Sequence, residues 1–118
     1  MNLFRRIKGS LGKCHLIWNG PEGCFATNRV SKDGLRVGYM YREQTESRFP
    51  DSGWRFLEGM EDHEYLADPE NTNIFRIQTI CQLDPAIIPY LHAPSGTAWE
   101  RNPDGTFTEV PFQPPEDE

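Results

Sequence analysis

Apolar and polar residues alternate with a period of two in the middle of the chain, as they do in β-strands with one buried face. Residues 35–42 would place on one face Leu35, Val37, Tyr39 and Tyr41, and on the other Arg36, Gly38, Met40 and Arg42. Residues 54–57 would likewise present Trp54 and Phe56 on one face and Arg55 and Leu57 on the other. We therefore predict two neighbouring strands that share an aromatic face.

Turn residues indicate how these strands connect. Asp33 and Gly34 are typical of a tight turn, so we predict that residues 25–30 and 35–42 pair as a hairpin. Because sequential strands usually neighbour each other, adding residues 54–57 gives a three-stranded antiparallel meander.

Helical segments are predicted to be short. Residues 61–67 carry carboxylates in a first turn, where the helix dipole favours them, and Pro69 would end the segment. Asp84 followed by Pro85 is typical of a helix start, and Pro89 limits that helix to one or two turns. Further segments are predicted as strands at residues 14–18, 74–78, 97–101 and 106–110, the last two as a second hairpin, and as a helical turn at 79–83. The expected fold is α+β, with a largely antiparallel sheet of about five to six short strands and two or three short helices.

The length of 118 residues indicates one domain. We expect a basic lead-in over residues 1–13, a single α+β domain over residues 14–112 and a disordered acidic tail over residues 113–118.

The charge balance bears on partners. Twelve Lys and Arg against eighteen Asp and Glu give a formal net charge of −6. Such a chain repels phosphate backbones, so we expect no nucleic-acid partner, and an alternative through Arg5, Arg6, Lys8 and Lys13 runs against this charge. The same charge favours association with a basic protein.

Two further features bear on location. No stretch approaches the ~20 apolar residues of a membrane helix, so we expect no membrane partner. The three cysteines form no CxxC pair and are odd in number, which argues against a disulfide framework. We therefore expect a cytoplasmic protein.

Side chains capable of metal or catalytic chemistry lack a supporting pattern. A zinc site would draw on Cys14, His15, Cys24, His63, Cys81 and His92, whose spacings match no ligand pattern, so core cysteines are favoured. Cys81 lies among apolar residues, where a thiol is inert as a nucleophile.

The carboxylates between residues 58 and 68 could act as acid and base, but a run of like charge is more often a solvated face. The glycines fit no phosphate-binding loop. We predict no enzyme, no cofactor and no metal site.

Aromatic and charged residues nevertheless combine as they do at interfaces. The candidate binding residues are Tyr41, Trp54, Arg55, Glu58, Glu61, Asp62, Glu64, Tyr65 and Asp68. For Trp54 a place in the core is favoured over a role as an anchor. For the acidic run 58–68, an interaction face and a merely solubilising face are equally supported.

Several motifs in a fixed order resemble a known family. They are residues 24–30 (CFATNRV), 37–43 (VGYMYRE), 51–56 (DSGWRF), 84–89 (DPAIIP) and 93–96 (APSG). Together they resemble the immunity protein 33-like family of small bacterial domains, grouped with immunity proteins of polymorphic toxin systems. The resemblance implies a protein that binds and neutralises a toxin, and it carries over no catalytic residues. Where family members often have a Gly-Asp-Glu-Asp-like run, Met60 and His63 interrupt the acidic residues here.

The predicted function is a non-enzymatic protein-binding module, an immunity-like protein whose partner would be a protein such as a basic toxin domain. The alternative is a small-ligand-binding protein or an enzyme with a pocket between the sheet and the short helices. That alternative requires polar groups converging on a cavity and a strongly perturbed titratable residue.

Overall fold

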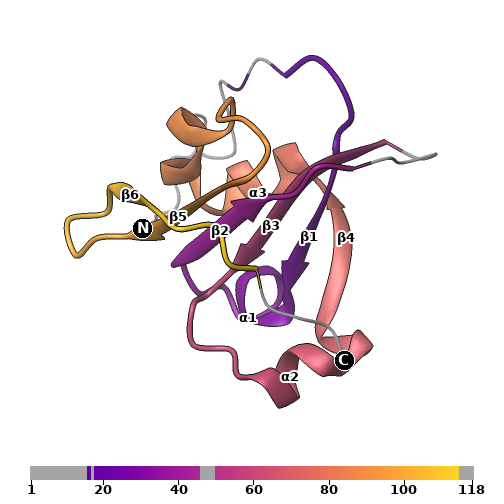
Figure 1. The fold of residues 1–118 in the computed structure, drawn as a ribbon. Helices are drawn as coiled ribbons and strands as arrows, with labels where there is room; N and C mark the ends of the chain where they lie inside the picture. The colour runs from indigo at the N-terminus through magenta and orange to yellow at the C-terminus, as the bar shows by residue number, and fades with distance from the viewer. Residues whose placement is uncertain (1–15, 17, 46–49, 115–118) are drawn as a thin grey trace, which may run out of the picture.

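A computed structural model describes residues 16, 18–45 and 50–114 and shows a six-stranded sheet with short helices around it (Figure 1). The strands are β1 (Gly23–Thr27), β2 (Tyr39–Arg42), β3 (Asp51–Leu57), β4 (Thr72–Arg76), β5 (Thr97–Arg101) and β6 (Phe107–Val110). The helices are α1 (Asn28–Ser31), α2 (His63–Ala67) and α3 (Ile77–Leu83), with 3-10 segments η1 (Pro69–Asn71) and η2 (Pro85–Tyr90). The predicted α+β fold class is confirmed.

The strand order is β4-β1-β3-β2-β5-β6, and every neighbouring pair is antiparallel except β1 and β3, which are parallel. The predicted hairpin of residues 25–30 with 35–42 is therefore wrong, because β3 lies between β1 and β2. The predicted meander holds only for the antiparallel pair β2 and β3.

The Asp-Gly turn ends a helix instead of joining two strands. The N–H groups of Lys32 and Asp33 donate to the Asn28 carbonyl at 2.8 and 2.9 Å, which closes the turn of α1. Gly34, at φ +73°, then terminates the helix in the left-handed conformation that helix ends favour. The same two residues thus suit either a hairpin or a helix end.

Alternation along β2 and β3 places their side chains on two opposite faces. We call the face with Met40, Trp54 and Phe56 the closed face: these side chains are fully buried, and α3 and η2 pack over them. We call the opposite face the open face; it carries Tyr39, Tyr41, Arg55 and Leu57. The prediction that Trp54 and Phe56 share one face and Arg55 and Leu57 the other is confirmed.

Two parts of the face assignment are wrong. β2 and β3 are neighbours but share no aromatic face, because Trp54 and Phe56 lie on the closed face whereas Tyr39 and Tyr41 lie on the open face. β2 begins at Tyr39, and Val37 before it is buried in the closed-face core rather than beside the tyrosines. The reason is that the Val37 N–H donates to the Asp84 carboxylate at 2.9 Å, outside the regular ladder. Residues 35–38 therefore lead into the strand without continuing its alternation.

The short helices and the second hairpin lie close to where the sequence predicts them. α2 begins after Asp62, whose carboxylate accepts from the Tyr65 N–H at 2.8 Å, and ends before Pro69 as predicted. Asp84 and Pro85 start a helical segment as predicted, and that segment is the 3-10 helix η2. The second hairpin is confirmed as β5 with β6. The strand predicted at 74–78 is two residues late, because α3 already begins at Ile77.

Some predictions lie wholly or partly outside the described residues. These are the lead-in of residues 1–13, residues 115–118 of the tail, and Cys14, His15 and Ile17 of the strand predicted at 14–18. Leu16 and Trp18, the described part of that segment, are not in a strand. In the described part of the chain, no helix has the length and apolar character needed to cross a bilayer.

Candidate binding site

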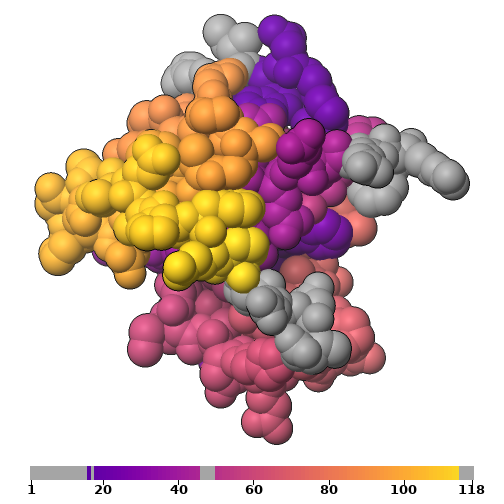
Figure 2. Space-filling view, viewed as in Figure 1, coloured from indigo at the N-terminus to yellow at the C-terminus, as the bar shows by residue number. Residues whose placement is uncertain are grey.

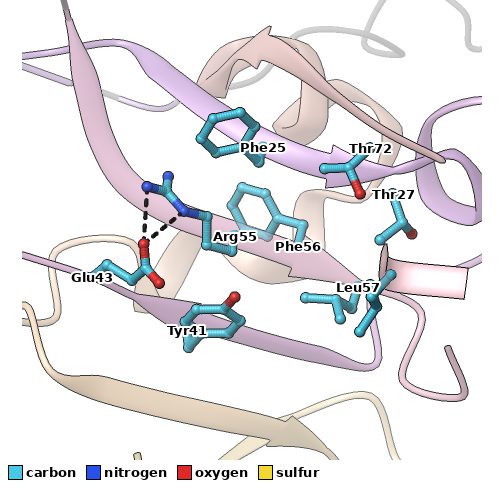
Figure 3. Close-up of a pocket in the computed structure, with 9 residues that line it drawn as sticks. Phe25, Thr27, Tyr41, Glu43, Arg55, Phe56, Leu57 and Thr72 are labelled. Atoms are coloured by element: carbon cyan, nitrogen blue, oxygen red, sulfur yellow. Dashed lines mark hydrogen bonds and ion pairs between the residues drawn. The ribbon is translucent and has the colours of Figure 1, made fainter. Parts of the chain in front are cut away.

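Arg55 lies at the centre of the open face, and each of its three guanidinium nitrogens donates at least one hydrogen bond. Its Nη1 and Nη2 each donate to the Asp51 carboxylate at 2.9 Å, and Nη1 also donates to the Trp54 carbonyl at 3.1 Å. Its Nε and Nη2 lie 3.2 and 3.1 Å from Oε1 of Glu43. The guanidinium sits 4.4 Å from the centroid of the Phe25 ring (Figure 3). The cation is therefore held rigidly, and its charge is compensated within the protein by Asp51 and Glu43.

A local irregularity in β3 brings these groups together. The Asp51 carboxylate also accepts from the Gly53 N–H at 2.9 Å. Gly53 has φ +92°, and a Cβ there would lie 2.2 Å from the Glu43 carbonyl oxygen. This close approach, with the 2.8 Å hydrogen bond from the Glu43 N–H to the Gly53 carbonyl, brings Glu43 next to Arg55. The motif Asp-x-Gly-x-Arg is thus one structural unit.

The ion pair stays charged at neutral pH. Burial by itself would raise the pKa of Asp51, but the hydrogen bonds from Arg55 and Gly53 and the charge of Arg55 outweigh it, so the pKa falls below its usual value. Burial would lower the pKa of Arg55, and the carboxylates of Asp51 and Glu43 outweigh that effect and raise it. Each partner therefore keeps the other ionised.

A pocket of about 290 Å³ opens beside this cluster. Its lining residues are Phe25, Thr27, Tyr41, Glu43, Arg55, Phe56, Leu57, Leu66 and Thr72. Figure 3 shows Arg55 and Glu43 at one end of the pocket and Thr27 with Thr72 at the other, with aromatic and aliphatic walls between them. Leu66 comes from α2, so this helix borders the pocket.

The pocket belongs to a row of side chains that crosses the whole sheet. Pairing of successive strands gives, on the open face, the order Ile74, Phe25, Arg55, Tyr41, Ala98 and Val110. Ile74 is 62% exposed, and the ring of Phe112 stands edge-on to Tyr41 at 6.2 Å. The open face therefore offers apolar surface around a neutralised cation.

The predicted site residues on β2 and β3 lie on opposite faces of the sheet. Tyr41 and Arg55 lie together on the open face. Trp54 is fully buried on the closed face, where its Nε1 donates to the Leu91 carbonyl at 3.0 Å. The core interpretation of Trp54 thus holds, and its ring offers no surface to a partner.

Most of the acidic run serves local structure. The Glu61 carboxylate accepts from Thr27 Oγ1 at 2.6 Å and from the N–H groups of Glu58 and Gly59 at 2.8 Å each. Asp62 caps α2, and Asp68 caps η1 through the Glu70 N–H at 3.0 Å. These carboxylates hold the loop before α2 and the start of each helix.

Two further predicted residues, Glu58 and Tyr65, contact Arg29 of α1, and a third, Glu64, lies on α2. Glu58 pairs with Arg29 at 3.1 Å, and the Arg29 guanidinium lies 4.6 Å from the centroid of the Tyr65 ring. Glu64 is exposed on α2, and no hydrogen bond or ion pair with another described residue engages it. Within the acidic run, Glu64 is therefore the cleanest probe of an interaction face.

Among the residues of the site that the sequence analysis did not select are Phe25, Glu43, Asp51 and Ile74. The Asp-x-Gly-x-Arg spacing was the available signal for Asp51. Nothing local signals Phe25 or Ile74, because their positions depend on the parallel pairing of β1 with β3 and on the return of β4 to β1.

The cysteines and histidines lie apart from this site. Cys24 and Cys81 are buried in the closed-face core, as predicted, and burial raises the pKa of Cys24 to about 12, so its thiol stays protonated. His63 and His92 are exposed, and His92 stacks on Trp18 at 5.3 Å. Within the described residues, His, Cys, Asp and Glu side chains form no group of three that could hold a metal ion.

Comparison with known proteins adds the family. The model of the Immunity protein Imm33 domain matches residues 24–111, which include five strands in full and β1 from its second residue. No curated protein and no solved structure gives a significant match. The family match covers most of the chain and includes every residue of the open-face row. The chain therefore belongs to the family of Imm33 immunity protein domains.

Proposed function

We propose that this chain is an immunity protein that neutralises a protein toxin by binding it directly, without catalysis. The observation that carries the proposal is the Imm33 family match over residues 24–111. A protein of this kind needs an accessible surface of suitable chemistry, and the open face supplies a candidate.

The proposed docking surface is the open-face row together with α2. Exposed Ile74 and half-buried Phe25 supply apolar contact area, while Tyr41, 9% exposed, forms part of the pocket wall and Arg55 adds a rigid, internally paired cation. Interfaces typically combine aromatic anchors and arginine in this way. α2, which borders the same pocket and carries Glu64, lies below the strands in Figure 1 and belongs to the pink lower lobe in Figure 2.

Charge supports a basic partner. The net charge of −6 would speed encounter with a basic toxin domain and make the association sensitive to salt. We also propose a cytoplasmic location, in keeping with the free, buried thiol of Cys24.

The proposal is tested by capture followed by a growth assay. The tagged chain is used to capture proteins from a lysate of its source, and each candidate is then produced alone in a bacterial host. We expect one captured protein to stop growth, co-production of this chain to restore it, and the two purified proteins to form a stoichiometric complex. Restored growth without a complex between the purified proteins would contradict direct binding. Covalent modification of the toxin by the chain would contradict the absence of catalysis.

A further inference from the structure

Glu43 holds the accessible acceptor of the Arg55 cluster. Its Oε1 accepts both contacts from Arg55. No hydrogen bond or ion pair joins its Oε2 to a described residue. The Glu43 side chain is 39% exposed, against 12% for Arg55 and 8% for Asp51. Figure 3 shows the second carboxylate oxygen of Glu43 turned away from Arg55. A ligand that enters the pocket can therefore reach a carboxylate oxygen.

The charge at this end of the pocket favours a ligand of positive charge. Two carboxylates, Asp51 and Glu43, face one guanidinium, so the cluster carries an excess negative charge. Because Arg55 already donates four hydrogen bonds and is paired with both carboxylates, an anion would meet a cation whose charge is compensated. A cation would find an unoccupied acceptor.

The walls of the pocket suit a long side chain with a charged end. Tyr41, Leu57 and Leu66 supply aromatic and aliphatic surface along the pocket. Lysine and arginine stems pack on such surface while their charged ends reach a polar partner, and aromatic faces attract the cation itself. The volume of about 290 Å³ is just below the range of drug-sized ligand sites, about 300–1,000 Å³, which fits a single side chain.

We propose that this pocket receives a basic side chain of the toxin, with its cation on Glu43 and its stem between Tyr41 and Leu66. This inference rests on the proposed function and specifies the chemistry of the same surface: the partner presents a protruding lysine or arginine.

A small probe tests the pocket without the toxin. N-acetyl-arginine amide is titrated into the labelled protein and followed by NMR, with N-acetyl-glutamate amide as the probe of opposite charge. We expect the arginine probe to shift the amides of Tyr41, Glu43 and Leu66, and Glu43→Gln to weaken its binding about tenfold, as for loss of a charge-assisted hydrogen bond. Glu109→Gln, an exposed change on β6, is the matched control and should leave the titration unchanged.

The outcomes separate the pocket from the proposed function. Absent shifts, equal shifts with the glutamate probe, or unchanged arginine binding in Glu43→Gln would overturn the pocket assignment. A toxin complex that forms equally well with wild type and Glu43→Gln would also overturn it, while direct binding would stand. Failure of any toxin to form a complex would overturn the proposed function, whatever the arginine probe shows.

Discussion

Asp51 serves two purposes with one carboxylate. It accepts a hydrogen bond from the Gly53 N–H within β3 and two from Arg55, and its side chain is only 8% exposed. Removing one partner of a buried ion pair leaves the other charge uncompensated, which costs far more than losing a surface pair. The stability of the open face should therefore depend on this residue.

We expect Asp51→Asn to lower the free energy of unfolding by about 3 kcal/mol at pH 7, near the lower end for breaking a buried pair. Because the pKa of Asp51 is lowered in the folded state, its contribution is fully present above the unfolded value of about 3.9 and is lost as the pH falls through the folded value. The difference between wild type and variant should thus shrink below about pH 4. Urea unfolding across this pH range measures it.

The exposed change Asp33→Asn is the control for Asp51→Asn and should stay within about 0.5 kcal/mol of wild type. A difference for Asp51→Asn that stays constant from pH 7 to pH 3 would show that the ion pair does not carry the effect.

The buried thiol of Cys24 gives a second prediction at this scale. Burial keeps the Cys24 thiol protonated, and only a thiolate reacts readily with alkylating reagents. We expect Cys24 to resist iodoacetamide in the folded protein and to react once urea unfolds it, as mapped by mass spectrometry. Rapid labelling of Cys24 under native conditions would contradict its placement in the core.

At the scale of elements, local signals predicted local structure well. The alternation in residues 54–57, the Asp84–Pro85 start and the turn between β5 and β6 each depend on neighbouring residues, and each was confirmed. The place of β1 depends on parallel pairing with a strand more than twenty residues away, which no local pattern encodes. Tyr41 and Arg55 could be selected from sequence because local alternation predicts their strands. Phe25 could not, because its place beside Arg55 depends on the parallel pairing of β1 with β3.

The acidic run shows a second limit of sequence reasoning. Its carboxylates look equivalent along the chain, yet Glu61 binds two backbone N–H groups and Thr27, while Glu64 faces solvent. Whether a carboxylate turns inward depends on which backbone donors the loop leaves free, and that follows from the fold.

Gly53 tests how far the Asp-x-Gly-x-Arg unit depends on its glycine. In Gly53→Ala, the new Cβ would lie 2.2 Å from the Glu43 carbonyl oxygen at a φ of +92°. We expect a loss of about 3 kcal/mol or more, from left-handed strain together with overpacking against backbone. Gly34→Ala, at φ +73° but with no atom within 4 Å, should cost only about 1–2 kcal/mol. Thermal unfolding of both variants measures the difference, and equal losses would contradict the close approach at Gly53.

At the scale of the whole molecule, the sheet has one face sealed by α3 and η2 and an opposite face on which Ile74 and the Glu43 side chain are exposed. The net charge of −6 acts on the approach of a partner, whereas contacts on the open face would set how long it stays.

Glu64 tests the contribution of charge. We expect Glu64→Lys to weaken toxin binding about three- to tenfold at low salt and to flatten its salt dependence, mainly through a slower association rate. Glu109→Lys makes the same charge change on β6, on the face opposite the tyrosines, and corrects for net charge. Equal effects of the two variants would show that α2 holds no special position in the interface.

The central claim is that a toxin binds directly to the open face. The most direct test measures the affinity between the purified toxin and two variants of this chain, each with one exposed apolar residue changed, one on each side of the sheet. Ile74 is 62% exposed on the open face, and Leu83 is 51% exposed on α3, which covers the closed face. Isothermal titration should show that Ile74→Lys loses at least about tenfold in affinity, as for removal of an interface contact, while Leu83→Lys binds like wild type. Unchanged binding by Ile74→Lys together with a loss in Leu83→Lys would contradict the account and move the interface to the helical side.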